Sequence, residues 1–185
     1  VDTLQYWDEK IETMRRDELE EFQLKHLKRM LSHAYNNSEF YRNSFREAGV
    51  NPEDVKTLSD LHKLPTIQKD DIRKDQECTP PLGKMTAVPE DDVVYISVSS
   101  GSTGMPTASP FTSQDFEDFM DFEARLFYSS GMRKHDRYCH ALNMSLFVGG
   151  PCVLGAQKIG ALCIHAGTIP SERLLRIMIQ FQPTI

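Results

Sequence analysis

Several classes of protein are excluded by what this sequence lacks. No apolar run approaches the ~18 residues that a membrane-spanning helix needs, and no block of like charge is long enough to indicate a disordered tail. The net charge of −6 argues against a nucleic-acid groove, which would carry clustered Lys and Arg. The first residues lack the basic and then apolar layout of a secretory signal. We therefore expect a cytoplasmic protein that binds neither nucleic acid nor a membrane.

The cysteines form no Cys-x-x-Cys pair. The four of them, at positions 78, 139, 152 and 163, have the spacing of neither a small disulfide-linked domain nor a zinc knuckle. Cys139-His140 and Cys163-Ile164-His165 bring thiols and imidazoles close together, so a zinc site assembled across strands is one alternative. Buried structural thiols are the other. We favour the thiols and predict no metal site.

What the sequence does contain divides at about residue 87. Residues 1–87 predict a helical module, because Leu19, Phe22 and Leu27 begin an apolar stripe at helical spacing that continues to Ala34. A shorter helix over 39–48 follows, and Gly49 ends it. Residues 69–75 predict one more short helix, and the segment around Pro80-Pro81 is irregular.

Residues 88–185 alternate between strand and helix patterns. Strands are expected at 93–98, 137–142 and 160–165, and helices at 113–130, 153–158 and 172–181. Thr112 and Ser171 are the expected helix caps. The last residues, 182–185, resemble the start of a further strand. The predicted fold class is α/β: a helical module followed by part of a mostly parallel sheet flanked by helices.

The octet at residues 99–106, Ser-Ser-Gly-Ser-Thr-Gly-Met-Pro, follows the first of these strands. Glycines allow a close approach of backbone to ligand, and hydroxyl and N–H groups can surround phosphate oxygens. It is neither a Walker loop nor a dinucleotide fingerprint. Pro106 disfavours an immediate helix, so we expect the chain to return as a hairpin through residues 107–111. The alternative is a plain polar hairpin tip, because Ser, Thr and Gly are common in turns.

The octet resembles the signature loop of the adenylate-forming ligases, and other segments resemble the phenylacetate–CoA ligase branch of that superfamily. The resemblance covers nearly the whole chain and rests on motifs in family order: Arg16–Leu19 through His33–Asn37, Phe40–Arg42, Ala48–Val50, Asp60–Pro65, Lys69–Arg73, Leu146–Gly150, Gly155–Gln157 and Ser171–Arg173. It implies the N-terminal portion of the acyl-adenylate-forming fold.

The resemblance also implies an activity and its ligands. Members of the family use ATP and Mg²⁺ to convert a carboxylic acid to an acyl-adenylate, and then transfer the acyl group to coenzyme A. Residues that would hold the β- and γ-phosphates of ATP are Ser99, Ser100, Gly101, Ser102, Thr103 and Gly104. The acyl pocket would include Met144, Phe147, Gly149 and Gly150. The substrate expected from the branch is an aryl acid such as phenylacetate.

Two departures limit this expectation. Relatives commonly have Lys where this chain has Met105, and Lys84 or Arg125 are candidates to supply the missing charge. Family members are more than twice as long, so this chain lacks the later nucleotide motifs, the acidic Mg²⁺ ligand and the domain with the adenylation lysine. We expect a piece that is inactive alone. Alternatives are a ligase that adenylates a deazaflavin coenzyme and a non-catalytic module whose open sheet edge favours a homodimer.

Overall fold

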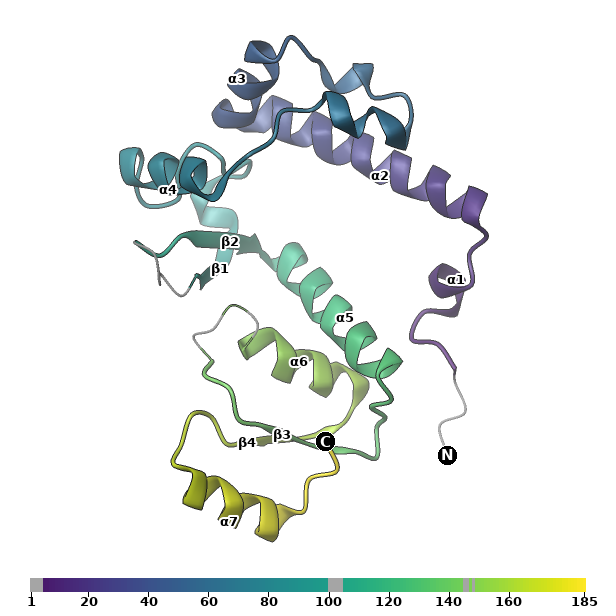
Figure 1. Ribbon diagram of the computed structural model, residues 1–185, viewed down its shortest axis with the longest axis vertical. Coiled ribbons are helices and arrows are strands. Elements are labelled where there is room, and N and C mark those ends of the chain that lie inside the picture. Colours follow the sequence, from purple (N-terminus) through teal and green to yellow (C-terminus); the bar gives the residue numbers. More distant parts are fainter. Residues whose placement is uncertain (1–4, 100–104, 145–146, 148) are drawn as a thin grey trace. The chain divides into compact units, whose positions relative to one another are not determined.

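The computed structural model describes residues 5–99, 105–144, 147 and 149–185 (Figure 1). The chain divides into two compact units. The helical unit comprises Thr13–Val94 and Gly101–Pro110; the α/β unit comprises Val1–Glu12, Tyr95–Ser100 and Phe111–Ile185. Residues 5–12 belong to the same unit as the C-terminal half of the chain.

The helical unit is organised around the long helix α2 (Arg16–Asn37), as the apolar stripe predicts. Its Leu31 is buried together with Phe45 of α3 (Glu39–Glu47) and with Val55. The Ser38 hydroxyl caps α3 by accepting a hydrogen bond from the Tyr41 amide at 3.3 Å. The remaining described helices of this unit are α4 (Lys69–Cys78) and the 3₁₀ helices η1 (Pro52–Asp54), η2 (Leu58–Lys63) and η3 (Glu90–Asp92).

Strands β1 (Val93–Val98) and β2 (Ala108–Thr112) are hydrogen-bonded neighbours in a two-stranded sheet. The pairing agrees with the expected return of the chain after Pro106. Gln76 of α4 extends the bonding of β2: its side chain donates to the Ala108 carbonyl at 2.8 Å and accepts from the Ala108 amide at 2.9 Å. These two bonds fix the start of β2 within the helical unit.

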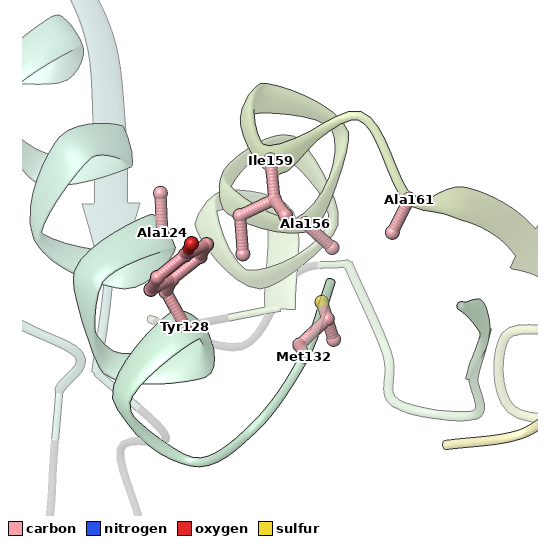
Figure 2. Close-up of a cluster of buried hydrophobic side chains, with 6 residues drawn as sticks. All are labelled: Ala124, Tyr128, Met132, Ala156, Ile159 and Ala161. Atoms are coloured by element: carbon pink, nitrogen blue, oxygen red, sulfur yellow. The ribbon is translucent and has the colours of Figure 1, made fainter. Parts of the chain in front are cut away.

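The core of the α/β unit lies between α5 (Ser113–Ser129) and α6 (Gly149–Ile159). The predicted cap of α5 is confirmed, because the Thr112 hydroxyl accepts from the Asp115 amide at 3.2 Å. Small and large side chains alternate across the contact, which lets the two helices approach closely. Figure 2 shows the buried cluster, made of Ala124, Tyr128, Met132, Ala156, Ile159 and Ala161.

Strands β3 (Arg137–His140) and β4 (Leu162–His165) pair in parallel, in a register that runs from Arg137 opposite Leu162 to His140 opposite His165. In Figure 1, α6 and α7 (Ser171–Phe181) lie on opposite sides of this pair. Residues 182–185, where a further strand was expected to start, are assigned no strand, but they bond to β3: the Cys139 amide donates to the Ile185 carbonyl at 2.9 Å, and the Ile185 amide donates to the Arg137 carbonyl at 3.2 Å.

Three details differ from the sequence prediction. In place of one sheet, the described residues form two separate two-stranded sheets, of which β3–β4 is parallel. Helix α6 begins at Gly149 rather than near Val153. Pro170 occupies the cap position of α7, and Ser171 is its first helical residue. Proline fits there because the first helical turn leaves amide groups without intrahelical partners.

Residues 5–12, at the beginning of the described chain, pack against α5. The Trp7 indole N–H donates to an Asp121 carboxylate oxygen at 3.1 Å, and its ring lies 5.7 Å from the Tyr128 ring. Arg125 also pairs with Glu12 of the short helix α1 (Glu9–Glu12) at 3.7 Å. No helix in the described part of the chain is long and apolar enough to cross a membrane.

Candidate functional site

The predicted phosphate loop follows β1, and only its first residue can be described. Ser99 lies directly after the strand, whereas Ser100, Gly101, Ser102, Thr103 and Gly104 lie outside the described residues. The strand alternates, with Ser97 buried and Val94, Ile96 and Val98 exposed. The roles assigned to the loop therefore stay predictions, but the structure fixes where the loop starts.

The end of β1, just before the predicted phosphate loop, is hydrogen-bonded to the predicted acyl pocket. The buried Ser97 hydroxyl donates to the carbonyl oxygen of Phe147 at 3.2 Å. Ser97 is two residues before the octet, and Phe147 is two residues before α6. The two predicted sites are about 45 residues apart in sequence, and this hydrogen bond in the α/β unit connects residues next to or within each of them.

Gly149 and Gly150 are buried at the start of α6. A Cβ at Gly149 would overlap the carbonyl oxygen of Asn143, so the chain's own backbone fills the space beside this residue. A Cβ at Gly150 would lie 3.3 Å from the Tyr95 hydroxyl and 3.6 Å from the Met144 methyl. Gly150 therefore faces the side chains of Tyr95 and Met144, and only glycine at position 149 lets the Asn143 carbonyl approach the helix this closely.

Aromatic rings surround Phe147 on one side. Its ring lies 5.7 Å from Phe119 and 6.3 Å from Phe111, and those two stack at 5.5 Å. Tyr95 extends the group, at 6.0 Å from Phe111 and 4.6 Å from Phe116. We call these five residues, Tyr95, Phe111, Phe116, Phe119 and Phe147, the aromatic cluster.

The other side of Phe147 is open, since the residue is 41% exposed, and the neighbouring Met144 is 44% exposed. Such a surface can bind an apolar ring or alkyl group by contact area and ring geometry. Sequence reasoning identified Phe147 and Met144 but missed Tyr95 and Phe111. Both come from the paired strands, so only the strand pairing could have indicated them.

A histidine that sequence reasoning weighed only as a zinc ligand lies at the carboxyl end of β3. His140 is 0% exposed, and its Nδ1 is 2.9 Å from the Tyr138 hydroxyl. Its ring centroid is 5.6 Å from that of His165, its register partner on β4. Burial, and secondly the neighbouring His165, lower the pKa of His140. Its Nε2 atom has no hydrogen-bond partner in the described residues. The ring is therefore held neutral at physiological pH.

Two of the four thiols, those of Cys152 and Cys163, are not poised to act as nucleophiles. Cys152 of α6 donates to the buried carboxylate of Glu123 on α5 at 3.6 Å. Burial, and then the Glu123 charge, raise the pKa of Cys152 to about 11. Burial also raises the pKa of Cys163. A thiol that stays protonated at neutral pH reacts slowly. Within the described ranges, no group of three or more His, Cys, Asp or Glu side chains is placed to hold a metal ion.

The two basic residues considered as substitutes for a lysine at position 105 have other partners. The Lys84 ammonium lies 2.7 Å from Glu39, and this pairing raises the pKa of Lys84. Arg125 lies 3.7 Å from Glu12 and 4.0 Å from Asp8. Each charge is thus partly neutralised by a nearby carboxylate, so neither is arranged as a dedicated phosphate ligand.

No family model matches the chain, but curated proteins that are similar to it share one activity. It is 36% identical over 176 residues to a phenylacetate–coenzyme A ligase of Pseudomonas putida, and 37% identical over 174 residues to that of Escherichia coli (strain K12). These alignments cover 95% and 94% of this chain but 39% of each relative. The chain thus spans about two fifths of the length of the curated relatives that it matches.

Solved structures agree. A 2-hydroxyisobutyryl-CoA ligase in complex with 2-HIB-AMP and CoA, in the thioesterification state, superposes with a TM-score of 0.92 at 29% identity. The match covers 99% of this chain and 39% of that one. The same enzyme in the postadenylation state with 2-HIB-AMP gives a TM-score of 0.91 at 28% identity. The chain belongs to the adenylate-forming ligase superfamily, as a homologue of the N-terminal portion of phenylacetate–CoA ligases.

Proposed function

We propose that this chain supplies the N-terminal part of an ATP-dependent acid–CoA ligase that forms an acyl-adenylate and then a thioester with coenzyme A. The observation that carries the proposal is the alignment with phenylacetate–CoA ligases over 95% of the chain. The hydrogen bond between Ser97 and Phe147 supports it, because Ser97 lies two residues before the predicted phosphate loop and Phe147 belongs to the predicted acyl pocket.

In this proposal the chain positions groups and performs no acid–base chemistry. Adenylation requires a carboxylate to attack the α-phosphorus of an anionic triphosphate, so donors that neutralise charge on the phosphates lower the barrier. Ser99–Gly104 would hold the β- and γ-phosphates and so orient pyrophosphate as the leaving group. Mg²⁺ would accompany ATP as its counterion. The described residues supply no ligand set for it, so no step is assigned to a chain-bound metal.

The acid is proposed to carry an apolar group that lies against the exposed side of Phe147. The aromatic cluster supports this, since Phe119 packs against one side of the Phe147 ring. The exposed and flexible Met144 side chain can adjust to the shape of the acid. An aryl acid such as phenylacetate fits by stacking or edge contacts. The relatives of known structure bind the adenylate of a small branched hydroxy acid, so acids of that size are the competing class.

The residues from 88 onward are proposed to form part of a nucleotide- and acyl-binding subdomain within a larger, mostly parallel sheet. Its support is the parallel β3–β4 pair, together with the parallel-type bonds between β3 and residue 185. β3 is thus bonded along both edges, as an interior strand would be.

The nucleotide part is tested by calorimetric titration of ATP with Mg²⁺ into the chain and into a variant with Gly101→Ala and Gly104→Ala. Binding that is lost in the variant, with an unchanged melting temperature, would support the phosphate role. Equal affinity in both proteins would contradict it. If neither binds, the loop alone is insufficient and the proposal that this chain holds the phosphates by itself fails.

The acid part is tested by saturation-transfer NMR with phenylacetate and with 2-hydroxyisobutyrate. Transfer to phenylacetate should fall severalfold in Phe147→Ala and stay unchanged in Phe122→Ala, because Phe122 is an exposed ring on α5 outside the cluster. Stronger transfer to the hydroxy acid would reverse the assigned substrate class. Equal transfer in both variants would remove Phe147 from the pocket.

A non-catalytic interaction module is the second candidate. It is favoured by α7, which buries none of its residues and exposes Leu175, Met178, Ile179 and Phe181. Exposed apolar patches of this kind mark association surfaces. Light scattering separates the candidates: a defined dimer that Ile179→Lys converts to a monomer would support the module.

A further inference from the structure

The helical unit contains a polar cavity that the proposed ligase function does not use. It opens between α2 and the segment around η1 and has a volume of about 380 Å³. This is within the range of small-ligand sites. Lining side chains come from two stretches of the chain: Lys28, Ser32, Tyr35 and Asn36 on α2, and Asn51, Pro52, Glu53, Val55 and Lys56 at η1.

The base of this cavity is rigid. Val55 is fully buried, and the Tyr35 ring meets the Phe45 ring edge-on at 5.9 Å. Val55 packs in the same core cluster as Leu31 and Phe45. A ligand therefore meets a preformed surface, which reduces the conformational entropy lost on binding.

Two positive charges border the cavity without a matching pair of negative ones. Neither Lys28 nor Lys56 forms an ion pair in the part of the chain that the structure describes. Of the lining residues only Glu53 is acidic, so the lining carries a net charge of +1 from two lysines and one glutamate.

Nearby carboxylates are already engaged. Asp54 accepts from the Asn51 amide at 2.8 Å. Asp60 accepts from the backbone amides of Lys56 and Thr57 at 2.9 and 2.7 Å, and also pairs with Lys63 at 2.6 Å. The bond to Lys63 and then the two backbone bonds lower the pKa of Asp60. Asp60 therefore stays ionised and accepts these hydrogen bonds at neutral pH. The two cavity lysines are left to attract an external anion.

The neutral groups indicate what else the ligand carries. The Asn36 side-chain amide donates a hydrogen bond to the Ser32 hydroxyl at 3.3 Å, and both residues line the cavity together with Tyr35 and Asn51. Amide and hydroxyl groups can donate and accept, as sugar hydroxyls require. A phosphomonoester carries a charge of about −1.5 to −2 at neutral pH, which suits two ammonium groups better than a carboxylate does.

We propose that this cavity binds a small phosphorylated sugar or nucleoside, with its phosphate between Lys28 and Lys56 and its hydroxyls toward Ser32, Asn36 and Asn51. None of its lining residues belongs to the predicted phosphate loop or to the aromatic cluster, so the site does not depend on either. Its limited volume favours a small molecule over a macromolecular partner.

The test is an NMR titration of the ¹⁵N-labelled chain with ribose 5-phosphate, with inorganic phosphate and ribose as separate arms. Saturable shifts at the amides of Ser32, Asn36 and Asn51 are expected, with a Kd in the millimolar range or below. The variant Lys28→Gln/Lys56→Gln should bind at least about tenfold more weakly, since it removes both charges. Lys25→Gln is the matched control on the same helix, outside the lining, and should retain the affinity within about twofold.

Each outcome decides the matter. If phosphate binds as tightly as ribose 5-phosphate, the site is a plain anion site and the sugar part of the proposal is wrong. If ribose alone binds equally well, the lysines have no role. Linear, unsaturable shifts that are the same in Lys25→Gln and the double variant would overturn the proposal, because they would reflect general attraction between charges.

Discussion

Replacing Gly155 with alanine tests how closely α5 and α6 pack. A Cβ built at this position would lie 2.6 Å from the Glu123 Cβ and 3.0 Å from the Ala124 amide nitrogen. Neither atom is the end of a flexible side chain, so the helices themselves must separate. Overpacking of this kind costs about 1–3 kcal/mol, and the severity of the overlap places Gly155→Ala in the upper half of that range.

One contribution has the opposite sign. Alanine in a helix interior is favoured over glycine by about 1 kcal/mol. The expected net effect is therefore a loss of about 1–2 kcal/mol in the free energy of unfolding, or about 3–6 °C in melting temperature. Gln157→Ala, at an exposed position two residues along the same helix, should change stability by less than about 0.5 kcal/mol.

Trp7 provides the assay. It is the only tryptophan of the chain, and it lies against Tyr128 and Asp121 of α5. Its fluorescence during urea unfolding therefore reports on the α/β unit rather than on the helical one. A Gly155→Ala protein as stable as the unmodified chain would refute the close packing of α5 on α6, and with it the need for glycine at this contact.

Three further predictions follow from described contacts. Burial, and secondly His165, lower the pKa of His140 in the folded state. The stability that neutral His140 contributes is therefore present above the unfolded pKa of about 6.5 and is lost as the pH falls below that value. Urea unfolding should show a lower free energy of unfolding at pH 5.5 than at pH 7.5, and His140→Asn should reduce this difference. Thr112→Ala removes the cap of α5 and should cost about 0.5–2 kcal/mol by thermal melting, while Thr112→Ser should restore most of it. Alkylation followed by mass spectrometry at pH 8 should modify the exposed Cys78 well before Cys152, and equal rates would contradict the burial of Cys152.

Local sequence patterns predicted the long helices because their signals are local. The apolar stripe of α2 and the Thr112 cap of α5 each lie within a few turns of chain, and both are confirmed. The start of α6 was missed because Gly149 and Gly150 are poor helix formers. Their place in the helix depends on the Asn143 carbonyl and the Tyr95 hydroxyl beside them, which are contacts made across the fold.

Long-range features were not predictable from local patterns. Glu123 lies among polar residues of α5 and would be assigned to a solvent-facing position, yet it is only 4% exposed, because α6 covers it. The hydrogen bond between Ser97 of β1 and Phe147 likewise joins residues 50 positions apart, which local patterns do not connect. In contrast, Met144 and Phe147 were identified by resemblance, and the structure describes both as partly exposed next to α6.

The bond from Trp7 to Asp121 joins residues 114 positions apart, and this separation has a kinetic consequence. Closing a flexible loop of that length costs about 4 kcal/mol of chain entropy, so the bond is a poor candidate for an early folding event. Most of the intervening chain belongs to the helical unit, and its helices should form quickly because helical contacts are local in sequence. Once folded, the helical unit reduces the length of flexible chain whose ordering opposes closure of this loop. Weakening the α2–α3 core should then slow the burial of Trp7.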